Sequence, residues 1–258
     1  MGREEPKSVV NRFEIRKKFL TQGVGNDRRG SDLDGIPGPL YLAGVTHTDP
    51  TTASTRADPT RPQLILASAS PRRSKILSDA GIRFEIKPST IVEETRAGES
   101  PARLAERLAT EKALDVARRI GPIPATPVLG ADTIVVLGND VLGKPRDEAH
   151  AVELLSRLVG TKHQVMTGIA LAWSDGQLTL SQVVTSEVEM RAASRQELVD
   201  YVSLGESLDK AGGYALQGEG RRFVVGVVGS ASNVIGLPLD ETLALFELAG
   251  VLDSMRAR

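Results

Sequence analysis

Residues 64–77 pass from an apolar run into a turn rich in serine and arginine, and this transition narrows the choice of fold. Serine is a favoured N-cap and proline a favoured first helical residue, so Ser70-Pro71 predicts a buried strand that turns directly into a helix. Arg72 and Arg73 then oppose the helix macrodipole unless an anion binds there. The pattern favours a phosphate-binding turn, with a solvated helix start as the alternative.

After that turn, apolar strand patterns alternate with amphipathic helix patterns. Turn residues at 138–140 and 174–176 indicate two hairpins, and Ser194 with Glu197 has capping-box spacing. Hairpins among helices favour an α/β fold with a mixed sheet over a doubly wound parallel one. The expected strands are 64–67, 84–87, 127–137, 141–142, 163–173, 178–190 and 222–228, and the expected helices are 71–80, 100–119, 147–158, 194–204 and 238–248.

Residues 1–61 differ from this pattern. They are rich in Gly, Pro, Thr and Asp, and apart from a short helical pattern over 9–20 they show no sustained periodicity. We therefore expect a mostly disordered extension over 1–61 and one folded domain over 62–258. Three early glutamates, at positions 4, 5 and 14, fit a transit peptide poorly.

Composition excludes several classes of protein. The 258 residues contain no cysteine, which rules out disulfides and thiolate metal sites and fits a reducing compartment such as the cytoplasm. A net charge of −1 and an aromatic content of 3% argue against a nucleic-acid partner. No apolar run reaches the ~18 residues of a spanning helix and no secretory signal region is visible, so neither a membrane partner nor secretion is expected.

Charged residues in apolar surroundings are the first candidates for chemistry. Asp132 interrupts a strongly apolar strand, where a carboxylate is costly unless it is paired or metal-bound, and Thr133 follows it. The alternative is an aspartate at a strand end that points to solvent. Lys112 on a helix, Lys144 in a turn and the glutamates at 93–94 are more weakly marked, since such residues are commonly just solvated. Placed opposite cations, the two glutamates could hold a hard divalent metal.

A second distinctive stretch, residues 208–218, combines glycines with a charged pair, a tyrosine and Gln217. Glycines let the backbone approach a ligand closely, and a glutamine amide can both accept from and donate to the edge of a base. An ordinary glycine-rich connection is the alternative. His163 begins a strand, where a hydrogen-bonded structural role is favoured over general-base catalysis.

Eight motifs, in this order along the chain, make the sequence resemble the Maf (septum formation inhibitor-like) family of nucleoside triphosphate pyrophosphatases. Each motif alone is weak, and together they cover Leu64 to about Val251. They are Ser68-Ala69-Ser70-Pro71-Arg72-Arg73, Glu111-Lys112-Ala113, Gly130-Ala131-Asp132-Thr133, Gly143-Lys144-Pro145, His163-Gln164-Val165-Met166-Thr167, Asp209-Lys210-Ala211-Gly212-Gly213-Tyr214, Leu216-Gln217-Gly218 and Asn233-Val234-Ile235-Gly236-Leu237-Pro238.

The resemblance implies a fold and a set of roles. The expected fold is an elongated mixed-sheet α/β domain with helices on its faces and a deep cleft between two lobes, an architecture shared with inosine triphosphatases. Asp132 is the expected proton acceptor, and Glu93, or else its neighbour Glu94, joins it at a Mg²⁺ or Mn²⁺ site. The expected triphosphate-binding residues are Ser68, Arg73, Lys112 and Lys144, and the residues expected to choose the base are Arg72, Thr133 and Gln217.

The activity implied by the resemblance is hydrolysis of a nucleoside triphosphate to the monophosphate and pyrophosphate, as house-cleaning of nucleotide pools. Within the family, residues 209–218 resemble the branch that acts on dTTP and UTP, modified pyrimidine nucleotides included. The same chemistry on 7-methyl-GTP or a purine stays open, as does a nucleotide-sensing regulator of septum formation. Family members often form dimers, so the resemblance also allows a homodimer.

Overall fold

The computed structural model describes residues 64–121, 126–174 and 178–256. The extension expected over 1–61, with its short helical pattern, lies outside the described residues, as does most of the turn expected at 174–176. Among the helices of the described residues, none has both the length and the apolar character needed to cross a bilayer.

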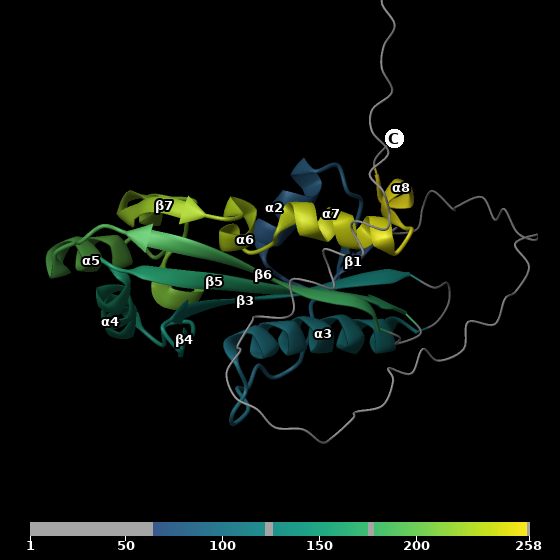
Figure 1. The fold of residues 1–258 in the computed structure, drawn as a ribbon, viewed down its shortest axis with the longest axis horizontal. Coiled ribbons are helices and arrows are strands. Elements are labelled where there is room, and N and C mark those ends of the chain that lie inside the picture. Colours follow the sequence, from purple (N-terminus) through teal and green to yellow (C-terminus); the bar gives the residue numbers. More distant parts are fainter. Residues whose placement is uncertain (1–63, 122–125, 175–177, 257–258) are drawn as a thin grey trace, which may run out of the picture. The chain divides into compact units, whose positions relative to one another are not determined.

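The described chain is built on a seven-stranded mixed sheet, which confirms the fold class expected from the sequence (Figure 1). The strand order is β2-β1-β3-β5-β6-β7, with β4 paired to β3. β1 runs parallel to β2 and β3, and the other strand pairs are antiparallel. The strands are β1 (Ile65–Leu66), β2 (Glu85–Ile86), β3 (Pro127–Leu137), β4 (Asp140–Leu142), β5 (Lys162–Trp173), β6 (Leu178–Met190) and β7 (Val224–Val228).

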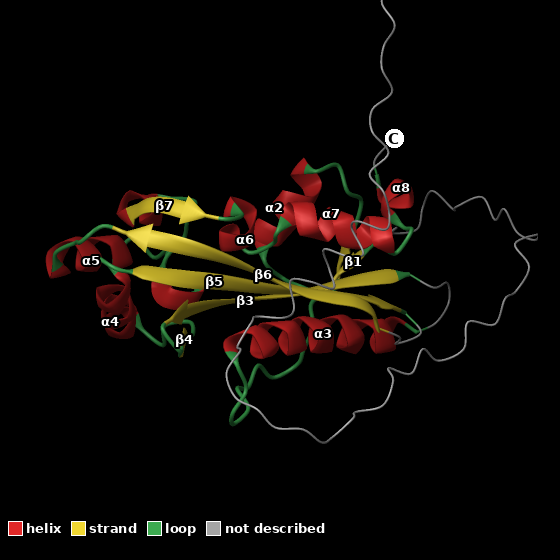
Figure 2. Ribbon diagram, in the orientation of Figure 1, coloured by secondary structure: helices red, strands yellow, loops and turns green. Residues whose placement is uncertain are grey.

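Helices cover both faces of the sheet. α3 lies on one face, and α2, α6 and α7 lie on the other (Figure 2). The helices are α2 (Pro71–Asp79), α3 (Pro101–Ile120), α4 (Glu148–Leu158), α5 (Arg195–Val202), α6 (Ala231–Ile235), α7 (Leu239–Leu248) and α8 (Leu252–Met255). Each helix expected from the sequence is present, the capping box at the start of α5 is confirmed, and α6 and α8 are additional.

Two local details differ from the pattern expected from the sequence. The first concerns only the side chain: Ser70 holds the predicted N-cap position of α2 with Pro71 following it, but its hydroxyl accepts from no backbone amide of the helix. The strand expected over 222–228 begins only at Val224, because Glu219–Phe223 forms a 3₁₀ turn that buries Phe223 in the core.

Apolar side chains form two main cores. One core joins α4 and α5 to the neighbouring ends of β3, β5 and β6, and includes Val135 and Tyr214. The other joins α2, α7 and β1 to the middle of β3 and β5, and Ile235 packs at its margin. Both cores reach β3, so this strand links the two halves of the described chain.

Helix α3 approaches the sheet more closely than an ordinary side chain would allow. A Cβ atom on Gly130 would lie 2.1 Å from the carbonyl oxygen of Ala109, and one on Gly168 would lie 2.1 Å from that of Ala105. Only glycine permits such contact between helix backbone and strand backbone. The two glycines therefore bring α3 against the middle of β3 and β5.

One edge of β3 is uncovered in its middle. β5 pairs with β3 along its length, but on the opposite edge β1 pairs only with Val128 and Leu129, and β4 pairs only from Val135 onward. No strand of the described residues covers the stretch between. Side chains alternate across a strand, so Asp132 and Thr133 leave this open edge toward opposite faces. Asp132 thus meets α3, whereas Thr133 meets the layer of α2 and α6.

Candidate active site

A cleft of about 650 Å³ opens at the uncovered edge of β3. It takes lining residues from both cores, including Val135 and Tyr214 from one and Ile235 from the margin of the other, as expected for a cleft between two lobes. The structure brings all the candidate residues of the sequence to this one cleft: Ser68, Arg72, Arg73, Glu93, Glu94, Lys112, Asp132, Thr133, Lys144 and Gln217.

At the centre of the cleft, one lysine contacts two carboxylates. Lys112 Nζ lies 2.6 Å from Asp132 Oδ1 and 2.6 Å from Glu93 Oε1. Lys112 and Asp132 are both buried, at 8% and 5% exposure, and buried charges of this kind persist when they are paired. The solvated alternatives for Lys112 and Asp132 are therefore wrong. Of the two adjacent glutamates, Glu93 makes the contact, whereas Glu94 meets Arg107 through its backbone carbonyl.

Cations keep the Glu93 side chain charged. Burial by itself raises the pKa of its carboxyl, but the hydrogen bond from Lys112 and the charges of Lys112, Lys144 and Arg73 outweigh burial, so the pKa is lowered. Lys144 is exposed on the loop after β4 and forms no hydrogen bond or ion pair with a described residue. A phosphate entering the cleft can therefore be met by Lys144 without breaking an existing bond.

The loop that carries Glu93 is tied to α3 on both sides. Before Glu93, Ser89 Oγ donates to Asp115 at 2.9 Å. After Glu93, Arg107 donates to both carboxylate oxygens of Glu99 at 2.7 Å, a bidentate pair that fixes geometry. Helix α3 therefore positions the lysine of the cleft and, through these anchors, the glutamate as well.

Arg73 is a buried cation beneath the cleft. Its Nε donates to the Gly236 carbonyl at 2.8 Å, Nη1 to Ser68 Oγ at 2.8 Å and Nη2 to Thr133 Oγ1 at 3.1 Å. Burial lowers the pKa of the guanidinium, and the nearby Asp132 carboxylate opposes that effect. All three nitrogens donate to other groups of the protein, so Arg73 joins α2, β3 and the end of α6. Its guanidinium therefore contributes positive charge to the cleft more than free hydrogen-bond donors for a ligand.

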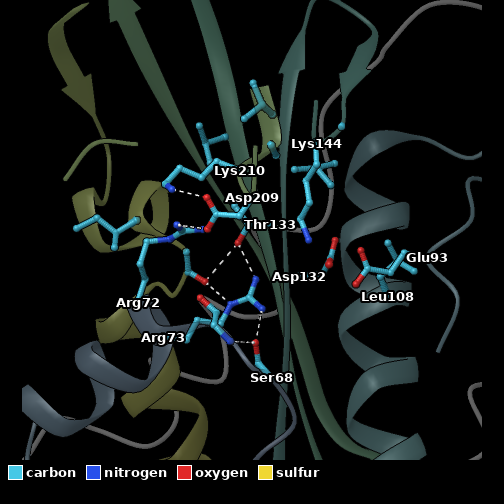
Figure 3. A pocket seen from close by; sticks show the side chains of 18 of the residues that line it. Ser68, Arg72, Arg73, Glu93, Leu108, Asp132, Thr133, Lys144, Asp209 and Lys210 are labelled. Atoms are coloured by element: carbon cyan, nitrogen blue, oxygen red, sulfur yellow. Dashed lines mark hydrogen bonds and ion pairs between the residues drawn. The ribbon is translucent and has the colours of Figure 1, made fainter. Parts of the chain in front are cut away.

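The polar residues of the cleft fall into two groups. Figure 3 shows Arg72, Asp209 and Lys210 on one side and Glu93, Asp132 and Lys144 on the other. In the first group, Arg72 Nη1 lies 3.4 Å from Asp209 Oδ2, and Lys210 Nζ donates to Asp209 Oδ1. Sequence reasoning missed Asp209 and Lys210 as individual residues, although their stretch was marked by its glycines. Gln217, on the same stretch, is exposed and its side chain bonds to none of the described residues.

His163 has the structural position expected from the sequence. It is 2% exposed, its Nε2 lies 2.7 Å from Tyr214 Oη, and the two rings meet edge to face. Burial lowers the pKa of His163 to about 4, so the imidazole is neutral near pH 7. The bond links the start of β5 to the stretch that carries Asp209 and Gln217.

The carboxylates of the cleft fit a divalent cation that is bound together with a ligand. Among the described residues, no group of three or more His, Asp or Glu side chains could hold a metal alone. Mg²⁺ in nucleotide enzymes is commonly held by one or two carboxylates plus phosphate oxygens. Glu93 and Asp132, which converge on Lys112 Nζ, supply that number of ligands.

Carboxylates, lysines and arginines lie together in the cleft at the uncovered edge of β3, and this combination is typical of a protein that binds a phosphorylated ligand. Comparison with known families agrees with this class. Residues 63–249 match the family described as Maf-like protein, and the chain belongs to this family. The resemblance found in the sequence motifs is thereby confirmed.

Two relatives of this chain have the same name. The chain is 50% identical over 188 residues to a protein of Myxococcus xanthus named dTTP/UTP pyrophosphatase, covering 73% of this chain and 93% of the relative. It is 48% identical over 194 residues to a protein of Salmonella typhimurium with the same name, covering 75% and 94%. Among solved structures, a nucleoside-triphosphatase / dITP/XTP pyrophosphatase from Mycobacterium abscessus shares 15% identity over 75% of this chain and 99% of that chain. Its TM-score is 0.37.

Proposed function

We propose that this chain is a nucleoside triphosphate pyrophosphatase that hydrolyses dTTP and UTP to the monophosphate and pyrophosphate. The observation that carries the proposal is the contact of Lys112 with both Glu93 and Asp132 inside a cleft that holds further cations. The names of relatives at 48–50% identity support the choice of substrates.

The triphosphate binds along the cations of the cleft. Lys112 and Lys144 meet phosphate oxygens directly, and Arg73 and Ser68 stand behind them on the other face of β3. Positive groups held in place before the substrate arrives stabilise charge that develops on the phosphates, and they need no reorganisation during the reaction.

Asp132 accepts the proton of the attacking water. Its Oδ1 already accepts from Lys112, which leaves Oδ2 to take the proton. The water oxygen bonds to the α-phosphorus while the bond from that phosphorus to the bridging oxygen breaks, and pyrophosphate leaves with the electron pair. Glu93 and Asp132 are the residues that would hold Mg²⁺ or Mn²⁺. When bound, such an ion withdraws negative charge from the phosphate oxygens.

Residues 62–258 are the catalytic unit in this proposal, and residues 1–61 lie outside it. The family match over 63–249 supports this boundary. We also assign the activity to the cytoplasm, which the absence of cysteine supports. A homodimer remains a prediction from the family resemblance.

The test is pyrophosphate release from dTTP, UTP, CTP, dGTP and 7-methyl-GTP, with and without Mg²⁺ or Mn²⁺. Metal-dependent release led by dTTP and UTP is the expected result. Release led by 7-methyl-GTP or a purine would replace the substrate assignment and keep the chemistry. No release from any nucleotide, with nucleotide binding intact, would favour the sensing role instead.

Asp132→Asn tests the proton acceptor. Removing a general base typically costs 10²–10⁴-fold in rate, so we expect kcat to fall by about 10²-fold or more while nucleotide affinity persists. Asp253→Asn, an exposed aspartate on α8, is the matched control and should leave kcat unchanged. Turnover that survives in Asp132→Asn would remove the base from the mechanism.

A further inference from the structure

Asp209 is an exposed carboxylate that two cations hold at the wall of the cleft. Arg72, from the start of α2, approaches one oxygen, and Lys210 approaches the other. Lys210 also donates to the backbone carbonyl of Glu206, so its ammonium is fixed from both sides. The Asp209 side chain is 66% exposed even with both partners, and it lines the cleft. An ordered carboxylate with this much free surface can bind a ligand.

The ligand group that meets Asp209 is not a phosphate. A carboxylate repels phosphate oxygens, and Asp209 stays charged because the bond and charge of Lys210 and the charge of Arg72 outweigh its burial and lower its pKa. The Lys112–Asp132–Glu93 contact and Lys144 lie in the other group of cleft residues (Figure 3). A nucleotide with its phosphates there would present its base, which is neutral, to Asp209.

The pair of Arg72 and Asp209 has a definite hydrogen-bonding pattern. A guanidinium only donates, and an ionised carboxylate only accepts. A carboxylate has about four lone-pair sites, so two bonds from Arg72 and Lys210 leave Asp209 able to accept more. The cleft thus presents a donor beside an acceptor, held in register by an ion pair.

Uracil and thymine have the complementary edge. Their O4 accepts and the adjacent N3–H donates, whereas cytosine has a donating amino group beside an accepting N3. We infer that Asp209 accepts the N3–H of the base while Arg72 donates to its O4, which makes Asp209 a specificity-determining residue against cytosine. This inference rests on the proposed function, since it assumes a pyrimidine triphosphate in the cleft.

The experiment compares kcat/KM for UTP, CTP and 3-methyluridine triphosphate, which lacks the N3–H. A site that hydrogen-bonds its substrate rejects analogues that leave a polar group unpaired, so the wild type should prefer UTP over both by about 100-fold or more. Asp209→Ala should shrink the ratio of UTP to 3-methyluridine triphosphate by about tenfold, the size of one lost hydrogen bond. Asp209→Asn, whose amide can donate as well as accept, should shrink the ratio of UTP to CTP.

Asp79→Asn is the matched control. Asp79 is a similarly exposed aspartate, paired at 3.0 Å with Lys75 on α2, and it does not line the cleft. Both ratios should stay at their wild-type values in this variant. Unchanged ratios in Asp209→Ala, or an equal loss of kcat/KM for all three nucleotides, would overturn the inference while the proposed function stands. Absence of pyrophosphate release from UTP by the wild type would overturn the proposed function itself, and this inference with it.

Discussion

The two walls of the cleft are built in different ways. On one wall, α3 lies against β3 and β5 with no side chain between the backbones at Gly130 and Gly168. Lys112 and Asp132 face each other there in nearly complete burial. The opposite wall is the 206–219 loop, and two of the residues that it contributes to the cleft, Asp209 and Gln217, are exposed.

The 206–219 loop is held by hydrogen bonds together with the packing of Tyr214 into the core. Its ends meet where Glu206 accepts from the amide of Glu219 at 3.1 Å, and Lys210 Nζ donates back to the Glu206 carbonyl. Its middle is anchored by the bond between Tyr214 and His163. The difference in exposure between the charged residues of the two walls indicates that the walls have different roles. The packed wall carries the groups that react, and the loop carries groups that meet the variable part of a ligand. Substitutions on the packed wall should therefore change stability and turnover, and those on the loop should change the ranking of substrates.

The largest effect is expected for Gly168→Ala. The added Cβ would lie 2.1 Å from the carbonyl oxygen of Ala105 in α3. A backbone atom of a helix cannot change position as the end of a flexible side chain can. Overpacking typically costs 1–3 kcal/mol, and here we expect the free energy of unfolding to fall by about 3 kcal/mol or more. Gly226→Ala on β7, where a Cβ meets nothing within 4 Å, is the control. Denaturant unfolding of both variants measures the difference. A decrease of less than about 1 kcal/mol in the free energy of unfolding of Gly168→Ala would mean that α3 can shift away from the sheet at little cost.

Lys112→Met should come next. It keeps an unbranched side chain one atom shorter but leaves the buried carboxylate of Asp132 without the ammonium that bonds to it. Removing one partner of a buried ion pair costs about 3–5 kcal/mol, and we expect the lower end because Glu93 can move toward solvent. Lys75→Met, which breaks an exposed pair on α2, should cost less than about 0.5 kcal/mol. Equal losses in the two variants would contradict the difference between packed and exposed charges.

Acid should weaken the anchor of the loop. The pKa of His163 is about 4 in the folded protein, against an ordinary value of 6.5, so the unfolded chain binds this proton first as the pH falls. The contribution of this residue to the free energy of unfolding is complete above pH 6.5 and is lost progressively between pH 6.5 and 4. At pH 5 the loss amounts to about 2 kcal/mol. Denaturant unfolding at pH 7 and pH 5 measures it. His163→Leu should lose that share of the pH dependence, and an identical dependence in the variant would assign it to carboxylates elsewhere.

Local signals predicted the elements well and long-range contacts poorly. β3 has the bounds expected from its apolar run and the turn that follows, since both signals lie within the strand and its immediate neighbours. α6 was missed because its five residues are too few to show a helical period. Ser70 marked the start of α2 correctly, although its side chain accepts from no backbone amide of the helix.

The candidate site shows the same limit. The sequence named ten residues that the structure brings to one cleft, and eight of them lie within the family motifs. The pairing of Arg72 with Asp209 joins residues 137 positions apart, and no local pattern encodes it. The close approach of α3 to Gly130 and Gly168 is a contact between distant parts of the chain, and no local pattern encodes it either.

Gln217→Ala should have the smallest effect on the fold and a selective effect on substrates. The side chain is exposed and bonds to no described residue, so the free energy of unfolding should change by less than about 0.5 kcal/mol. If its amide meets the base, the loss of one hydrogen bond should lower kcat/KM for the preferred nucleotide by about 5–10-fold and leave poor substrates nearly unchanged. Gln196→Ala, an exposed glutamine on α5 outside the cleft, is the control. A ranking of dTTP, UTP and CTP that is the same in the wild type and Gln217→Ala would remove Gln217 from base choice, and would leave Arg72 and Asp209 as the groups inferred to meet the base.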